Sequence, residues 1–95
     1  MRRHLIGNPR GPDWEFEGEE IIHQVGNDIG GVTVYRTSGG TYVVRQVRSA
    51  TGGREPLNRL AKFEDLQELA EWIGHSPDAK LLLRELGYGA TINIA

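Results

Sequence analysis

The sequence predicts an α+β fold, in which an antiparallel meander sheet of three to four strands carries two short helices packed on one face. Residues 32–37 and 41–47 are rich in β-branched and aromatic side chains and flank a glycine turn, as is typical of a β-hairpin. Residues 65–74 and 76–87 repeat apolar side chains at helical spacing between capping residues. Strands followed by helices indicate one α+β domain, which we place at residues 13–95.

The first segment, residues 1–12, is expected to form an extended or mobile N-terminal arm. Glycine and proline interrupt any regular element there, at Gly7, Pro9, Gly11 and Pro12. Beyond the arm, Trp14 and Phe16 alternate with acidic residues at the period of a half-buried strand. Gly18 is expected to mark a β-bulge in this strand.

The hairpin of residues 32–47 turns at Ser38-Gly39-Gly40, and two registers fit its sequence. A two-residue loop places Arg36 and Arg45 on the same face as Val32, Val34, Val43 and Val47. A three-residue loop places the two arginines on opposite faces, because side chains alternate along a strand. The sequence leaves both registers open, and the surface that the arginines form depends on the outcome.

The segment 56–63 fits either a further strand or the first turn of a helix entered at Pro56. We favour the strand, because a better helix start follows. Asp65 is a good N-cap residue, and Glu68 three positions later completes a pattern like a capping box.

A second helix is bounded by Ser76 as its cap, Pro77 at its first position and Gly87 at its end. After it, residues 91–94 alternate between polar and apolar side chains. We therefore expect a C-terminal edge strand there, and an unpaired edge of this kind could also join two copies into a homodimer.

The order of elements resembles the C-terminal β-rich portion of bacterial EXLDI-type proteins, over residues 16–95. The resemblance is carried by the strand, Gly-Gly turn and returning strand of residues 34–44 and by the Asp65-capped helix. That family is named for a terminal E-x-L-D-I motif, whose positions fall here on Ala90, Ile92, Asn93 and Ile94. Its ribbon-helix-helix-like N-terminal segment is not found in these residues. The resemblance implies this topology and a regulatory role.

Composition excludes several kinds of site. The chain has no cysteine, so disulfides, thiolate nucleophiles and Cys-based zinc sites are ruled out. Its longest aliphatic run, residues 81–83, is far too short to span a bilayer, and Gly7, Asn8 and Pro9 interrupt any signal-peptide core after the first arginines. We expect a cytoplasmic protein with no membrane partner.

Side chains suited to catalysis or metal binding are few, and we expect neither an enzyme nor a bound metal or cofactor. A Ser38, His23 and Asp28 set can be assembled on paper, but no nucleophile-elbow pattern supports it. His23 with Asp28, or His75 with Asp78, supplies two metal donors where zinc sites use three or four. The glycine pairs match neither a Walker motif nor a dinucleotide fingerprint, so turns explain them better.

Charge is strongly segregated along the chain, although the net charge is only −2. Between Ile29 and Phe63, six cations face a single anion, Glu55, which gives this segment a net charge of +5. The six cations are Arg36, Arg45, Arg48, Arg54, Arg59 and Lys62. Acidic stretches flank the segment on both sides, and such fields bias which surfaces a protein meets.

A nucleic-acid interface is one interpretation of this basic segment. A two-stranded ribbon can enter the DNA major groove, and Tyr35 and Tyr42 could stack on single-stranded bases. The pI near 5.9 lies below that of dedicated nucleic-acid domains. In the other interpretation the arginines form ion pairs within the fold, with Glu68, Glu71 and the acidic residues 15–20.

A protein interface is the second functional interpretation. Trp72 lies off the centre of the apolar stripe of its helix and is flanked by Glu68 and Glu71, an arrangement that suits a binding hot spot. Trp14 lies beside the arm, where a partner could bind by strand addition. Either tryptophan can instead cover a sheet edge within the fold.

We therefore predict a small non-enzymatic regulatory or inhibitory interaction module that binds another macromolecule, with a protein as the favoured partner. The first alternative is a nucleic-acid-binding accessory protein that uses the basic hairpin region, residues 36–62. By analogy with proteins of similar size and charge pattern, a second alternative is a phage- or mobile-element-encoded inhibitor of a bacterial defence nuclease complex.

Overall fold

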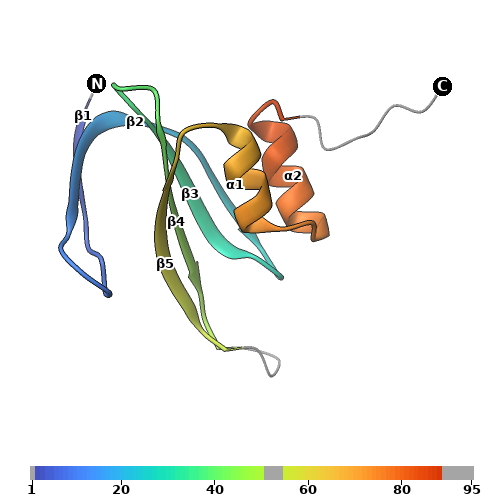
Figure 1. Ribbon diagram of the computed structural model, residues 1–95. Coiled ribbons are helices and arrows are strands. Elements are labelled where there is room, and N and C mark those ends of the chain that lie inside the picture. The colour runs from blue at the N-terminus through green and yellow to red at the C-terminus, as the bar shows by residue number, and fades with distance from the viewer. Residues whose placement is uncertain (1, 51–54, 89–95) are drawn as a thin grey trace.

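The computed structural model describes residues 2–50 and 55–88, which form five strands followed by two helices (Figure 1). The elements are β1 (Arg2–Ile6), β2 (Trp14–Gly26), β3 (Gly30–Thr37), β4 (Tyr42–Arg48), β5 (Leu57–Phe63), α1 (Leu66–Ile73) and α2 (Pro77–Glu85). The strands make one antiparallel sheet in the order β1-β2-β3-β4-β5. The predicted α+β class with an antiparallel sheet is confirmed, and the predicted three to four strands are corrected to five in this part of the chain.

The additional strand, β1, lies in the segment that the sequence marked as an extended or mobile arm. Its residues pair with the first half of β2, from Arg2 opposite Gly18 to Ile6 opposite Trp14. Ile6 is buried, with 5% of its surface exposed. The sequence of β1, RRHLI, has three polar residues in a row before two apolar ones, so it lacks the period-two alternation of a half-buried strand, and this explains why the prediction missed it.

Strand β2 is unusually long and exchanges one partner for another along its length. Residues Trp14 to Gly18 pair with β1, and residues Gly18 to Gly26 pair with β3. A Cβ atom at Gly18 would lie 2.4 Å from the carbonyl oxygen of Arg36, so only glycine allows this approach of the two strands. The irregularity lies between Glu20 and Ile22, not at Gly18 where the sequence predicted a bulge.

The β3–β4 hairpin has the three-residue loop. Thr33 lies opposite Arg45 and Arg36 opposite Tyr42, which leaves Ser38-Gly39-Gly40 as the turn. Gly40 has a φ of +87°, the left-handed conformation that a three-residue hairpin loop requires at its last position. This register places Arg36 and Arg45 on opposite faces of the sheet, which decides between the two alternatives left by the sequence.

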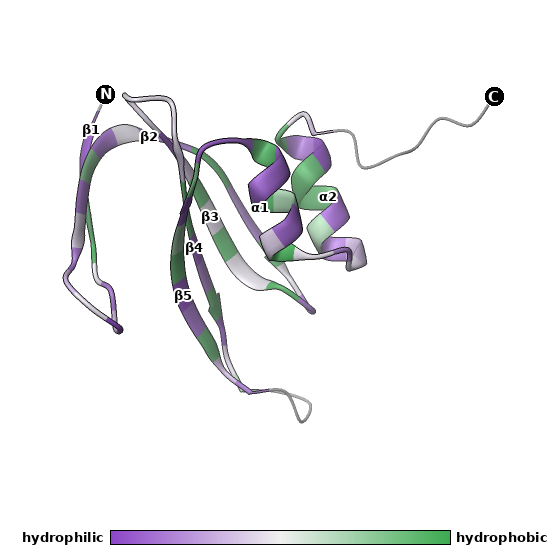
Figure 2. Ribbon diagram, in the orientation of Figure 1, coloured by the Kyte–Doolittle hydropathy of each residue, from purple (hydrophilic) through white to green (hydrophobic). Residues whose placement is uncertain are grey.

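The main core lies where the helices pack on one face of the sheet. Val32, Val34 and Val44 of β3 and β4 are fully buried against apolar side chains of both helices. The helical members of this cluster are Leu69, Ala70, Ile73, Ala79, Leu82 and Leu83. Hydrophobic bands on α1, α2 and β3 are visible in Figure 2. Each fully buried Val or Leu contributes about 1.5–3 kcal/mol, so this layer dominates the stability of the fold.

Both helices begin at the caps that the sequence predicted. The Asp65 side chain accepts a hydrogen bond from the Glu68 amide, and the Ser76 hydroxyl accepts one from the Ala79 amide. These caps satisfy amides that have no partner within the helix. Segment 57–63 is strand β5, so the favoured strand is confirmed over a helix entered at Pro56.

A carboxylate junction ties α2 to the turn between β2 and β3. The Asp28 carboxylate accepts hydrogen bonds from the Ser76 hydroxyl (2.7 Å) and the Asp78 amide (3.4 Å). In return, the Asp78 carboxylate accepts one from the Asp28 amide at 3.0 Å. The helix dipole favours the Asp28 carboxylate at the N-terminus of α2. Together, these hydrogen bonds and the dipole hold the start of α2 against the β2–β3 turn and so fix its place on the sheet.

The expected C-terminal edge strand, residues 91–94, lies outside the described residues. Neither helix of the described chain has the length and apolar character needed to cross a membrane.

Replacing Gly18 by Ala should destabilise the protein by about 1–3 kcal/mol, because the added methyl group clashes with the β3 backbone. Gly39→Ala is the matched control, since its Cβ would meet nothing closer than 3.8 Å. Urea unfolding followed by circular dichroism measures both. Equal stability of the two variants would contradict the close approach at Gly18.

Candidate functional site

The sheet has a second face, turned away from the helices, and its curl makes this face concave. In Figure 1, β1 and the first half of β2 stand apart from β4 and β5 on the side opposite the helices. We define the concave face by Ile6, Trp14, Phe16, Tyr35 and Val43, which share this side by the alternation of side chains. Val43 is 2% exposed although neither helix of the described residues packs on this face.

Three aromatic rings pack together where β1, β2 and β3 meet on the concave face. The His4 ring lies 5.3 Å from Phe16 and 4.8 Å from Tyr35, and Phe16 meets Tyr35 edge-on at 5.3 Å. His4 Nε2 also lies 3.1 Å from the carbonyl oxygen of Gly18. These contacts secure β1 and give the concave face a rigid aromatic wall.

An open groove of about 620 Å³ adjoins this wall beyond the end of β3. We call it the β2 groove. Its lining residues are Trp14, Glu15, Phe16, Glu17, Thr37, Ser38, Gly39, Thr41, Val43 and Lys62. Apolar rings and a valine therefore line part of the groove, small polar residues of the β3–β4 turn line another part, and charged groups of both signs lie at its border. This mixture is typical of a surface that binds a ligand by shape and orients it with few polar groups.

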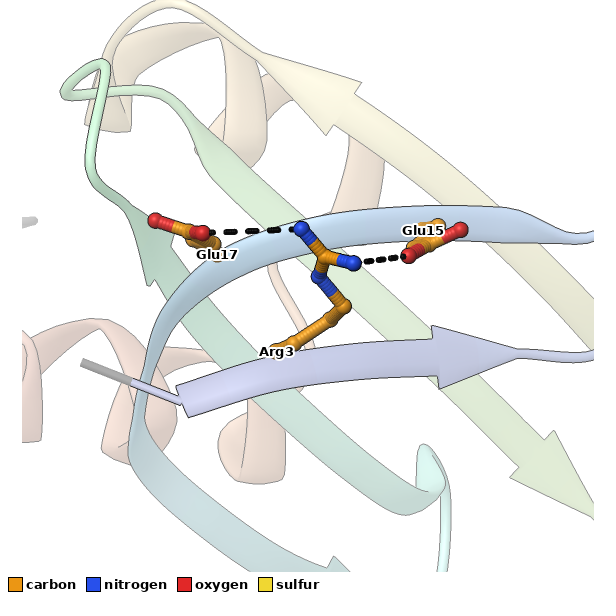
Figure 3. A network of polar contacts seen from close by, with 3 residues as sticks. All are labelled: Arg3, Glu15 and Glu17. Atoms are coloured by element: carbon orange, nitrogen blue, oxygen red, sulfur yellow. Dashed lines mark ion pairs between the residues drawn. The ribbon is translucent and has the colours of Figure 1, made fainter.

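The acidic border of the groove is partly neutralised by one arginine of β1. Arg3 lies between Glu15 and Glu17, with ion pairs of 3.1 and 3.7 Å (Figure 3). All three side chains are more than half exposed, so each pair is worth little in water. Glu19 and Glu20 continue the acidic series along β2 and are exposed as well. This border remains a negative surface open to a positively charged partner.

The structure distributes the predicted basic residues over both faces of the sheet. By strand alternation, Arg45 and Lys62 lie on the concave face with Tyr35. Arg36 and Tyr42 lie on the helix face, where the Arg36 guanidinium donates a hydrogen bond to the Tyr42 hydroxyl and lies over its ring.

The two other described arginines of that set, Arg48 and Arg59, are held within the fold. The Arg48 guanidinium donates to the carbonyl oxygens of Asp28 (3.1 Å) and Glu55 (3.0 Å). Arg59 donates to the side chain of buried Gln46 at 2.7 Å. Burial, with the nearby charges of Arg48 and Arg10 adding to it, lowers the pKa of Arg59 below its ordinary value. Arg54 lies outside the described residues.

Trp72, the predicted partner-binding residue of α1, packs against β5. Its ring centroid lies 5.4 Å from that of Phe63 and 4.0 Å from the guanidinium carbon of Arg59. Glu68 and Glu71 are exposed on the same helix. Trp72 thus covers part of the sheet, whereas Trp14, the other predicted anchor, lines the β2 groove. Whether any of these residues binds a partner stays a prediction.

The Ser38, His23 and Asp28 set is not brought together. Ser38 lies in the β3–β4 turn, and its amide donates to the Glu17 carbonyl. His23 Nδ1 lies 2.7 Å from the Thr33 hydroxyl, and Asp28 belongs to the junction with α2. Across residues 2–50 and 55–88, no cluster of three or more metal-binding side chains occurs.

Phe16 and Val43 line the groove but were not among the site residues predicted from the sequence. A usable signal was the regular alternation of residues 13–17, which puts aromatic rings on one face of a strand and carboxylates on the other. The alternation alone does not predict the curl of the sheet. It is this curl that turns the aromatic face inward.

No family model, no curated protein and no solved structure matches the chain. The resemblance to EXLDI-type proteins therefore stays a prediction, and its terminal motif positions lie outside the described residues.

Trp72→Ala should destabilise the protein by about 2 kcal/mol, less than the ~3–5 kcal/mol of a fully buried tryptophan, because Trp72 is half-buried. Trp72→Phe keeps an aromatic contact with Phe63 and is the control, with a smaller loss. Chemical unfolding of both variants measures the difference. An unchanged stability of Trp72→Ala would show that the ring is free for a partner.

The burial of Tyr35 makes the free energy of unfolding depend on pH and fixes the sign of that dependence. Burial, with Glu20 adding to it and Arg45 opposing it, raises the pKa of Tyr35 above its ordinary value of 10.0. The protonated Tyr35 hydroxyl therefore contributes to the stability of the folded state below pH 10. This contribution is lost as the pH rises through the folded-state pKa of Tyr35. The wild type should lose more stability above pH 10 than Tyr35→Phe in matched denaturant titrations; equal losses would contradict this assignment.

Proposed function

We propose that this protein is a small non-enzymatic interaction module that binds another protein, with the β2 groove as its docking surface. The observation that carries the proposal is the composition of the groove. Trp14 and Phe16, both half-buried, offer apolar surface beside the exposed carboxylates of Glu15 and Glu17. A partner segment with an apolar side chain next to a basic one complements both features, since complementary charge speeds encounter and a buried aromatic anchor supplies affinity.

The distribution of basic residues favours a protein partner over a nucleic acid. A nucleic-acid surface needs cations arranged along one face to follow the phosphates. Here Arg36 and Arg45 face opposite sides, while Arg48 and Arg59 donate to groups within the fold. The carboxylates at the groove would repel phosphates, which weighs against the nucleic-acid alternative even though Arg45 and Lys62 share the concave face with Tyr35.

A regulatory or inhibitory role follows as part of this proposal. A module that binds without transforming its partner acts by covering a surface or by bringing two proteins together. The resemblance to EXLDI-type proteins supports the same role. We place no reaction at the β2 groove and assign no cofactor to it.

A displayed library of randomised heptapeptides, selected against the full chain, tests the proposal. Enriched peptides should bind in fluorescence anisotropy, and Trp14→Ala should weaken them at least about tenfold, equivalent to about 1.4 kcal/mol. Glu71→Ala, which removes an exposed carboxylate of α1 outside the groove, should leave the affinity unchanged.

Labelled single- and double-stranded DNA, titrated at low and physiological salt, completes the test. We expect no binding at either salt concentration. DNA binding that collapses at higher salt, together with a failure to enrich peptides, would replace the proposal with the nucleic-acid alternative. Peptides that bind Trp14→Ala as tightly as the wild type would move the docking surface away from the groove.

A further inference from the structure

The β2 groove runs beside a backbone edge that no strand covers in the described chain. Residues Trp14 to Gly18 of β2 pair with β1 on one side, and pairing with β3 on the other side begins only at Gly18. Residues 14–17 therefore have a strand partner on one edge alone. Their other edge adjoins the groove, because all four of these residues line it.

One hydrogen bond shows which backbone groups point to this edge. The Ser38 amide, in the β3–β4 turn, donates to the Glu17 carbonyl at 2.9 Å. In a strand the amide and carbonyl of one residue point to the same side, and the side alternates from one residue to the next. The amide and carbonyl of Glu15 therefore point the same way as the Glu17 carbonyl, whereas those of Trp14 and Phe16 point to β1.

We propose, building on the function proposed above, that the partner binds as an extended strand beside residues 14–17 of β2. Its backbone would exchange two hydrogen bonds with Glu15, in line with β3. The turn contact between Ser38 and Glu17 already occupies the first position of this ladder, so the partner strand would continue the ladder where the turn leaves it. Strand addition of this kind takes its affinity from main-chain hydrogen bonds and its specificity from alternate side chains.

The alternation of β2 defines the chemistry of the partner. The partner residue opposite Glu15 places its side chain on the face of Glu15 and Glu17, where a lysine or arginine would be favoured. The residues before and after it place their side chains on the concave face, against Trp14 and Phe16. The partner segment therefore has the order apolar–basic–apolar.

The probe is an acetylated, amidated peptide with the sequence Thr-Val-Arg-Val-Thr, labelled and titrated into the full chain by anisotropy. Two changes each remove one main-chain hydrogen bond: N-methylation of the peptide arginine, and Glu15→Pro in the protein. Proline at position 15 deletes an amide that β1 does not use, so the sheet should tolerate it. Each change should lower the affinity at least about tenfold. Glu15→Gln keeps the amide and should cost no more than about threefold.

Circular dichroism melts check that Glu15→Pro is folded, and the N-methylated peptide tests the same contact without changing the protein. If peptide binding survives both changes but is lost in Trp14→Ala, strand addition is overturned while the proposed function stands. If neither this probe nor any selected peptide binds the wild type, the proposed function fails as well. A protein that dimerises with rising concentration, and becomes monomeric as Glu15→Pro, would overturn the assignment of a foreign partner by placing a second copy there.

Discussion

The approach of β2 to β3 at Gly18 is the constraint on which the rest of the molecule depends. A side chain there would overlap the Arg36 carbonyl, so the two strands come together only because the position is glycine. At this residue β2 leaves one partner and takes the other. The first half of β2 then carries β1 away from the helices (Figure 1), and this divergence produces both the concave face and the uncovered edge.

The two faces of the sheet consequently have different roles. The helix face holds the apolar core and fixes α2 through the Asp28 and Asp78 carboxylates. On the concave face, the curl of the sheet brings β1 and the first half of β2 toward the other strands. The aromatic residues of this face border an open groove. The carboxylates of Glu15 and Glu17 beside that groove discourage non-specific pairing with other strands, as charges on exposed edges do. They leave it suited to a positively charged segment.

Local features of the fold could be predicted from the sequence, and long-range ones could not. Neighbouring residues alone determine the helix caps at Asp65 and Ser76 and the strand of segment 57–63. The local sequence pattern was therefore sufficient to predict them. The hairpin register changes when the loop is one residue longer or shorter, and β1 forms only by pairing with β2 across a loop. The local sequence pattern determines neither feature. For the candidate site, Trp14 was among the predicted partner-binding residues and lines the groove, but the sequence left open which face carries the basic residues, and they occur on both.

Amide hydrogen exchange of the free protein, measured by NMR, shows directly whether the edge of β2 at residues 14–17 is as uncovered in solution as it is among the described residues. The amides of Glu15 and Phe16 are neighbours, but the first points to the groove and the second to β1. The Glu15 amide should exchange at nearly the rate of an unstructured amide, while the Phe16 amide should be protected by its hydrogen bond to β1. Equal protection of both amides would show that the edge is already occupied, and would contradict the account.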